Sequence, residues 1–291
     1  MAEELNFKQE LTGCFGFPVA ENPTQAMIEP AYAAMGLDWR YLTLEVRPEN
    51  LAAAVAGARA FGLRGFNCTI PHKIEVIQHL DGLGESAELM GAVNCVVNRD
   101  GQLIGENTDG KGFVSSLKEL TDPAGKSAVI FGAGGAARAI SVEMALAGAN
   151  DITIVNRSPE RGNGLVDLLN SKVKQVCNGA LEARFVQWND DFQIPANTDV
   201  VINATSIGLF PDVDARLALD VESLEPEMVV ADVIPNPPKT RLVKDATERG
   251  CKVIDGLGML VAQGVISIEY WTGKSPDARV MRGGLEAVFG A

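Results

Sequence analysis

The sequence is poor in the residues that build metal centres. It has two histidines and five cysteines in 291 residues, and no two cysteines stand in a CxxC pair. A Cys/His metal site needs several such ligands at short spacing, so none is expected. Cys14, Cys68 and Cys95 stand among apolar neighbours, which favours small buried side chains over nucleophiles. An odd set of cysteines without this spacing fits a reducing cytoplasm.

Long apolar runs are also missing. No stretch approaches the roughly 18 consecutive apolar residues of a membrane-spanning helix. The N-terminus reads MAEELNFKQEL and carries acids where a secretory signal has a basic and then an apolar region. We therefore expect a cytoplasmic protein that does not associate with membranes.

Positive charge is scarce. The chain has 25 Lys and Arg against 38 Asp and Glu, a formal net charge of −13. This balance argues against a sequence-independent grip on nucleic acid or anionic lipid, which needs excess basic residues. An apolar fraction of 46% excludes intrinsic disorder. Any anionic ligand must be held by a few well-placed groups.

Strand-like and helix-like segments alternate along the whole chain. Strands are predicted at 11–15, 41–46, 65–70 and 93–98, and helices at 26–36 and 49–62. After a turn at 121–126, further strands are predicted at 128–131, 151–156, 199–203, 228–232 and 252–255. Residues 259–289 read as helical, with a break at 272–276.

This pattern predicts an α/β protein with mostly parallel sheets, and the length favours two domains. The first is a substrate-binding domain over 1–110, completed by C-terminal helices over 259–291. The second is a Rossmann dinucleotide-binding domain over 111–258.

A glycine-rich turn follows the strand predicted at 128–131 and opens an Ala-rich helix. Its residues are Gly132, Ala133, Gly134, Gly135, Ala136 and Ala137. Glycines permit a tight turn and let a pyrophosphate approach the helix N-terminus, and the small Ala137 permits close helix–strand packing. The alternative is a tight turn without a ligand, but the flanking strand and helix favour a dinucleotide.

The next strand ends in the polar residues Asn156, Arg157 and Ser158, with Arg161 one turn later. NAD sites usually place an acid here for the ribose 2′-hydroxyl. A guanidinium with amide and hydroxyl donors suits a 2′-phosphate instead. NADP is therefore favoured over NAD, although a solvated surface arginine would give the same letters.

Three polar residues are candidates for proton transfer and substrate binding. Lys73 follows a strand and Pro71, Asn94 enters a strand, and Asp109 stands near the predicted domain crossing. Ligand sites favour domain interfaces and strand ends, so these groups could meet if the strands near Lys73 and Asn94 are adjacent. A lysine paired with a carboxylate can relay a proton to or from a hydroxyl. An ordinary salt bridge remains the alternative.

Several motifs together resemble the shikimate dehydrogenase family, nearly from end to end. They are NCTIPHK (67–73), GAVN (91–94), GENTDG (105–110), GAGGAARA (132–139), NRS (156–158), NATSIG (203–208), GLGMLVAQG (256–264) and YWTG (270–273). The resemblance implies NADP-dependent, reversible reduction of 3-dehydroshikimate to shikimate, a step toward chorismate and the aromatic amino acids. It implies Lys73 and Asp109 as the catalytic pair. The substrate contacts would be Thr69, Asn94 and Gln263, while Thr205, Ser206 and Gly256 would line the nicotinamide side.

Two departures from the family pattern concern the substrate. The family usually has Ser-x-Ser-Pro after the first strand, whose hydroxyls bind the substrate carboxylate; here Asn22 and Thr24 take those places, with Glu21 beside them. A like charge near a carboxylate weakens its binding. A tyrosine frequent in the family before Asn-Pro is replaced in the segment Ile234-Pro235-Asn236-Pro237. A quinate or other shikimate-analogue dehydrogenase is therefore an alternative.

Two further interpretations compete with this one: a folate-type methylene dehydrogenase and a non-catalytic NADP-responsive binding protein. Retention of both Lys73 and Asp109 argues against the second, and the combination of NTDG with MLVAQG argues against the first. A small polyol acid is expected as the substrate. A monomer or a homodimer is expected.

Overall fold

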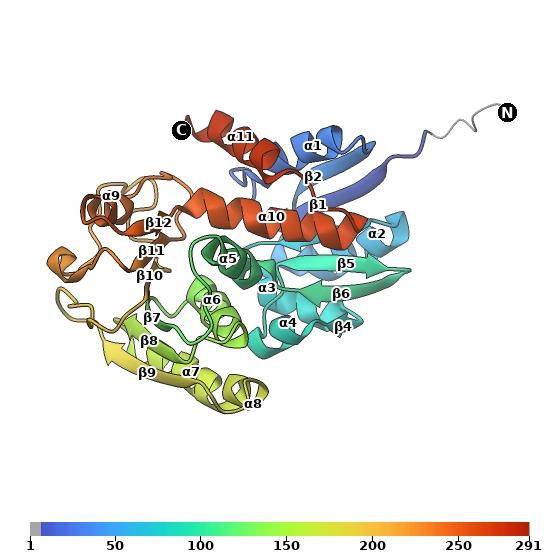
Figure 1. Ribbon diagram of the computed structural model, residues 1–291. Coiled ribbons are helices and arrows are strands. Elements are labelled where there is room, and N and C mark those ends of the chain that lie inside the picture. Colours follow the sequence, from blue (N-terminus) through green and yellow to red (C-terminus); the bar gives the residue numbers. More distant parts are fainter. Residues whose placement is uncertain (1–6, 291) are drawn as a thin grey trace. The chain divides into compact units, whose positions relative to one another are not determined.

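The computed structural model describes residues 7–290 and divides into two compact units. Unit 1 comprises Met1–Asn107 with Gly264–Val288, and unit 2 comprises Thr108–Gln263 with the last three residues. Helix α10 (Gly256–Thr272) runs from one unit into the other along the chain (Figure 1).

Unit 1 is built on a six-stranded sheet in the order β2-β1-β3-β5-β6-β4. The pairs β1–β2, β1–β3 and β4–β6 are parallel, whereas β3–β5 and β5–β6 are antiparallel, as expected for a mostly parallel sheet. The strands are β1 (Glu10–Gly16), β2 (Trp39–Glu45), β3 (Gly65–Cys68), β4 (Gly82–Leu83), β5 (Cys95–Arg99) and β6 (Gln102–Glu106).

Helices connect these strands and bury apolar side chains against the sheet. They are α1 (Thr24–Ala34), α2 (Leu51–Phe61), α3 (His72–Glu75), α4 (Glu85–Met90) and α11 (Ala278–Phe289). Helix α2 ends at Gly62, whose φ of 67° is the left-handed conformation that a C-terminal glycine adopts without strain. Phe15 and Phe66 stack at 4.3 Å within the core of this unit.

Unit 2 contains a six-stranded, fully parallel sheet in the order β12-β11-β10-β7-β8-β9. This is the strand order of a Rossmann dinucleotide-binding sheet. The strands are β7 (Ser127–Phe131), β8 (Asp151–Asn156), β9 (Glu182–Gln187), β10 (Val200–Asn203), β11 (Val229–Asp232) and β12 (Lys252–Ile254).

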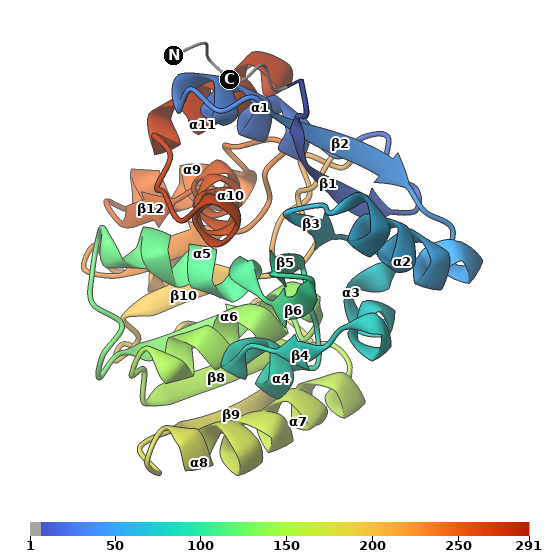
Figure 2. The ribbon, with the colours of Figure 1, turned by 90° about the vertical axis from the view of Figure 1, so that its right-hand side faces the viewer.

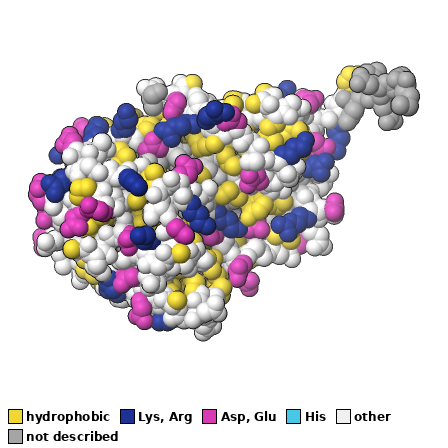
Figure 3. All heavy atoms as spheres, viewed as in Figure 1, with side chains coloured by type: hydrophobic (Ala, Val, Ile, Leu, Met, Phe, Trp, Pro, Cys, Tyr) yellow, Lys and Arg dark blue, Asp and Glu magenta, His cyan; other side chains and the backbone are white. Residues whose placement is uncertain are grey.

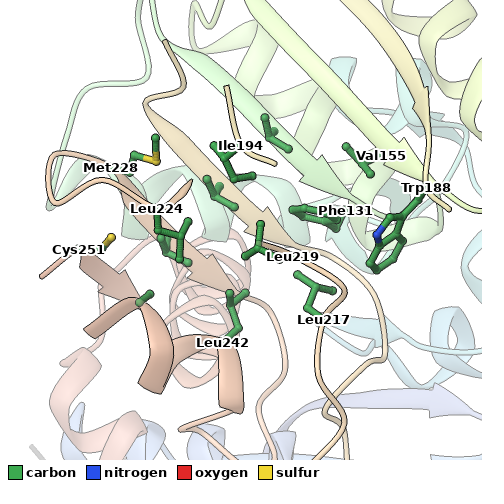
Figure 4. Close-up of a cluster of buried hydrophobic side chains, with 14 residues drawn as sticks. Phe131, Val155, Trp188, Ile194, Leu217, Leu219, Leu224, Met228, Leu242 and Cys251 are labelled. Atoms are coloured by element: carbon green, nitrogen blue, oxygen red, sulfur yellow. The ribbon is translucent and has the colours of Figure 1, made fainter. Parts of the chain in front are cut away.

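The helices of unit 2 pack on this sheet and on one another. Helix α6 follows β7 in the chain, and α9 contacts β11 and β12. Helix α7 lies along β8 and β9 (Figure 2). The helices of unit 2 are α5 (Thr108–Lys118), α6 (Gly135–Leu146), α7 (Pro159–Leu168), α8 (Lys174–Val176) and α9 (Arg241–Glu248). Figure 4 shows part of the core, where Phe131 and Val155 lie beside Trp188.

The predicted strands and the broken C-terminal helix are all present, with ends shifted by a few residues. Four short strands and helices around 72–106, the helices α5, α8 and α9, and the pair α7 and β9 were not predicted. Apart from β9, these segments are short or polar, so hydrophobic periodicity gives little signal for them. Strand β6 in particular pairs antiparallel with β5 through a tight turn at 99–102.

The surface mixes charges of both signs. On the face shown in Figure 3, Lys and Arg side chains alternate with Asp and Glu rather than forming one basic block. Within residues 7–290, no helix combines the length and apolar character that a membrane crossing requires.

Candidate functional site

The turn between β7 and α6 leaves space beside its backbone. Gly132 has φ of 109°, and a Cβ there would lie 2.9 Å from the Ala204 carbonyl oxygen. A Cβ on Gly134 or Gly135 would meet nothing within 4 Å, and both residues are exposed. Gly134 caps the twelve-residue helix α6, with Ala133 and Ala136 half-buried around it. The turn thus forms an open backbone cradle at a helix N-terminus, which suits a pyrophosphate.

Basic groups gather at the end of β8, the strand next to β7. Arg157 and Arg161 are exposed. The Asn156 side-chain amide donates to the Ser158 carbonyl oxygen at 3.0 Å, and the Ser158 hydroxyl accepts from Arg161 N at 3.3 Å as the cap of α7. Asn156 therefore holds the loop, and the guanidinium groups and the Ser158 hydroxyl proton are the donors suited to a phosphate.

The loop after β10 is held by its own side chains. The Thr205 hydroxyl donates to Asn203 Oδ1 at 2.7 Å and accepts from Ile207 N at 3.1 Å. Ser206 is exposed in the same loop, and Gly208 turns it with φ of 96°. The Thr205 side chain thus shapes this loop, and Ser206 is its exposed hydroxyl.

A buried carboxylate joins the ends of β10 and β11. Asp232 accepts hydrogen bonds from Asn203 Nδ2 at 3.1 Å, from the Thr240 hydroxyl at 2.7 Å and from Ile234 N at 3.1 Å. Burial raises the pKa of Asp232, and these donors oppose the rise. Thr240 also caps α9, so one carboxylate connects two loops and a helix start.

Helices α5 and α10 bring other expected site residues together in unit 2. The Thr108 hydroxyl donates to Gln263 Oε1 at 3.3 Å, and Asp109 follows Thr108 in the first turn of α5. A Cβ on Gly112 would lie 2.6 Å from Gln263 N, so this glycine permits the close approach of the two helices. Gly256 packs against the backbone of Ile234 and Pro235, which accounts for a glycine there independently of a ligand.

The strands that lead to Lys73 and from Asn94 are adjacent, since β3 pairs with β5. Val93 N donates to the Lys73 carbonyl oxygen at 2.7 Å, and Cys68 N donates to the Asn94 carbonyl oxygen at 2.9 Å. Thr69 directly follows Cys68, is half-buried, and donates its N–H to the Phe15 carbonyl oxygen of β1 at 3.0 Å. Unit 1 therefore holds Thr69, Lys73 and Asn94 in one region, while Asp109 and Gln263 belong to unit 2.

The segment that differs from the family pattern starts helix α1. Asn22 Oδ1 accepts from Thr24 N at 3.0 Å, and Asn22 Nδ2 lies 3.9 Å from Cys14 Sγ. Thr24 is buried, whereas Glu21 is exposed. The side-chain oxygen of Asn22 therefore accepts a hydrogen bond from the backbone at the start of α1. The paired serine hydroxyls of the family are absent. Ile234, in the other departing segment, is 2% exposed and offers no hydroxyl.

Several residues serve the structure. His72 is buried, with Nε2 2.6 Å from the Val46 carbonyl oxygen, as expected for a structural histidine. The Trp271 indole donates to the Val96 carbonyl oxygen at 3.0 Å, which ties α10 to β5. Cys14, Cys68 and Cys95 are buried as predicted, and burial raises the pKa of Cys14 to about 11. Within the described chain, no three His, Cys, Asp or Glu side chains group as metal ligands do.

Two residues at the carboxyl ends of strands in unit 2 were missed in the sequence. Asp232 ends a predicted strand as an unremarkable acid, and Trp188 follows the unpredicted β9. The alternation in EARFVQW before and at Trp188 was the available signal for β9. Asp232 pairs with Asn203 29 residues away and Trp188 with Ala218 30 residues away, which no local pattern shows.

Comparison with known proteins gives a consistent picture. The family model described as the shikimate dehydrogenase substrate binding domain matches residues 14–96, and the shikimate 5'-dehydrogenase C-terminal domain matches residues 256–283. Shikimate dehydrogenase (NADP(+)) of Desulforamulus reducens is 40% identical over 283 residues, covering 96% of this chain and 95% of its own.

Solved structures agree with the sequence relatives. The ligand-free 5-ketofructose reductase of Gluconobacter sp. strain CHM43 is 53% identical, with a TM-score of 0.93 over 98% of this chain and all of its own. A shikimate dehydrogenase in complex with NADP+ is 38% identical, with a TM-score of 0.87 over 98% of each chain. The fold class and the family resemblance expected from the motifs are confirmed, and the curated relatives are NADP-dependent oxidoreductases. The chain belongs to the shikimate dehydrogenase family.

Proposed function

We propose that the chain is an NADP(H)-dependent oxidoreductase that reduces the ketone of an uncharged polyhydroxylated substrate of the 5-ketofructose type. The observation that carries this choice is the start of α1, where Asn22 and Thr24 stand in place of a serine pair. The exposed Glu21 carboxylate beside these two residues would repel a substrate carboxylate, whereas the Asn22 amide and the Thr24 hydroxyl can each form a hydrogen bond with a substrate hydroxyl. The 53% identity to a 5-ketofructose reductase supports the same choice.

The residues of unit 2 fit the cofactor. The Gly132–Ala136 turn would hold the pyrophosphate, and Arg157 with Arg161 would hold the 2′-phosphate. When bound, NADPH supplies the hydride that reduces a carbonyl carbon to an alcohol. Lys73 and Asp109 are the groups proposed to deliver the accompanying proton to the carbonyl oxygen.

Reduction of 3-dehydroshikimate is the second candidate. Curated shikimate dehydrogenases about 40% identical cover nearly the whole chain, and Thr69, Lys73, Asn94, Asp109 and Gln263 all match the family motifs. This substrate carries a carboxylate, which the changed segment at 22–24 would hold less well.

A cytoplasmic location and a monomeric or dimeric state stay predictions from the sequence.

A kinetic comparison tests the proposal. Oxidation of NADPH is followed with 5-ketofructose, 3-dehydroshikimate and the corresponding ketone of quinate, and kcat/KM is compared. The highest value with 5-ketofructose supports the proposal, and the highest value with 3-dehydroshikimate supports the second candidate. Binding of NADP without turnover of any ketone would leave a non-catalytic binding protein and refute both.

A further inference from the structure

Arg157 lies over the face of Trp188. Its guanidinium carbon is 5.1 Å from the ring centroid, within the range of a cation–π contact. The two residues lie at the ends of neighbouring strands, since β8 pairs with β9 in parallel. Trp188 N also donates to the Asn156 carbonyl oxygen at 3.0 Å, directly before Arg157. The backbone thus fixes the ring beneath the guanidinium.

The indole itself is immobilised by the core of unit 2. Trp188 is 6% exposed, and its Nε1 donates to the Ala218 carbonyl oxygen at 2.9 Å. Its ring lies 5.2 Å from Phe131, which in turn meets Phe192 edge-on at 5.7 Å. Figure 4 shows Trp188 beside Phe131 and Val155 at the margin of this cluster. The ring is therefore a fixed platform, whereas Arg157 is exposed.

An exposed arginine side chain loses conformational freedom when it binds a phosphate. A guanidinium that lies on a fixed aromatic face has already lost part of this freedom in the free protein, because the ring favours one orientation. Less conformational entropy is then lost when the phosphate binds. The planar edge of the group stays available for two parallel hydrogen bonds to phosphate oxygens. The ring should not affect the affinity for a ligand that lacks a phosphate at this position.

We infer that Trp188 is a positioning residue for cofactor specificity, which holds the Arg157 guanidinium in place for the 2′-phosphate of NADP. This inference rests on the proposed use of NADP. It assigns to the core tryptophan a share in the choice of NADP over NAD, although Trp188 need not touch the cofactor.

Two small ligands isolate the effect from catalysis. Adenosine 2′,5′-bisphosphate carries the 2′-phosphate, and adenosine 5′-monophosphate is the matched ligand without it. The ratio of their dissociation constants, measured by calorimetry, reports discrimination at the 2′-position alone. In Trp188→Leu we expect this preference to fall about two- to fivefold, the range of an exposed cation–π contact. In Trp188→Phe, which keeps an aromatic face, most of the preference should remain.

A double-mutant cycle separates positioning from general damage to the fold. With Arg157→Ala already present, Trp188→Leu should no longer change the ratio, because no guanidinium is left to position. The inference is overturned if Trp188→Leu lowers the preference for the 2′-phosphate equally with and without Arg157, or does not lower it at all. If Trp188→Leu does not fold, Trp188→Met replaces it, since methionine adapts to irregular core space without supplying a ring. A parent protein that does not distinguish the two ligands refutes NADP use itself.

Discussion

The side chain of Asn203 donates to the buried carboxylate of Asp232, with Nδ2 3.1 Å from both carboxylate oxygens. The two residues end the adjacent strands β10 and β11. Asn203 also accepts from Thr205, so the loop after β10 depends on this pair. The carboxylate thereby links two loops on the carboxyl edge of the sheet, where ligands bind in Rossmann folds.

Replacement of Asp232 by asparagine should destabilise the protein. The new amide group would face the donors of Asn203, Thr240 and Ile234, so a buried hydrogen bond is lost. We expect the free energy of unfolding to fall by about 1–3 kcal/mol in urea titrations. Asp220→Asn is the control, because Asp220 likewise accepts from a backbone N–H but in an exposed turn. Equal losses of stability in Asp232→Asn and Asp220→Asn would contradict the special role given to the buried carboxylate.

Two glycines of the cofactor turn should respond differently to alanine. Gly132→Ala places a Cβ 2.9 Å from the Ala204 carbonyl oxygen at φ of 109°, so the free protein should lose about 1–3 kcal/mol of stability. Gly134→Ala meets open space at φ of −88°, so it should unfold nearly as the parent does. Its NADP dissociation constant should nevertheless rise about tenfold or more, because the Cβ occupies the cradle. Unchanged NADP affinity in Gly134→Ala would remove this turn from the cofactor site.

Lys73→Ala should lower kcat by about 10²–10⁴-fold, because the proposed proton transfer is lost. The dissociation constant of NADP should not change, since the residues proposed to hold the cofactor belong to unit 2 and Lys73 to unit 1. Ile74→Ala serves as the control, because this neighbouring side chain is 66% exposed. A kcat near the parent value in Lys73→Ala would exclude Lys73 from the chemistry.

Restoring a serine pair should shift the substrate preference. The double variant Asn22→Ser and Thr24→Ser supplies two hydroxyl donors where the family binds a carboxylate. We expect kcat/KM for 3-dehydroshikimate, relative to 5-ketofructose, to rise about tenfold or more, since Thr24 already has a hydroxyl and the variant adds one new hydroxyl bond to a charged group, which contributes about 1.5–3 kcal/mol. The ratio is read from initial rates with both ketones. A ratio that stays at the parent value would show that this segment does not select the substrate.

Asp81 should contribute stability that depends on pH. Its carboxylate accepts from Leu103 N at 2.7 Å and from the Arg59 guanidinium at 2.9 Å, and these bonds lower its pKa. A lowered pKa in the folded state means that the unfolded chain binds the proton more tightly. The contribution is therefore present above the ordinary carboxyl pKa of about 4 and is lost as the pH falls through the lower folded value.

Urea midpoints of Asp81→Asn and the parent measure this effect. The variant should unfold at lower urea than the parent at pH 7, and the difference should shrink as the pH falls below about 4. Asp100→Asn is a suitable control, because Asp100 is an exposed carboxylate in the turn between β5 and β6. If Asp81→Asn lowers the urea midpoint equally at pH 7 and below pH 4, the ionised form of Asp81 is not what stabilises the protein.

The parts of the fold that were predictable are those encoded locally. The five predicted strands of unit 2 are short apolar runs, and the Gly132–Ala137 turn stands between one of them and a helix. Local patterns of this kind reflect burial on both faces of a parallel sheet and the φ values that only glycine adopts freely. Segments that escaped prediction, such as β4 and α3, are too short to show that contrast.

The candidate site divides in the same way. The glycine-rich turn at 132–137, the arginine after β8 and the loss of the serine pair at 22–24 can be read from the residues alone. Two contacts appear only in the folded protein: the Arg157 guanidinium lies over the Trp188 ring, and Asn203 donates to Asp232. The physical reason is that each contact joins the ends of two neighbouring strands, and the strand order, which depends on packing of the whole sheet, brings those ends together.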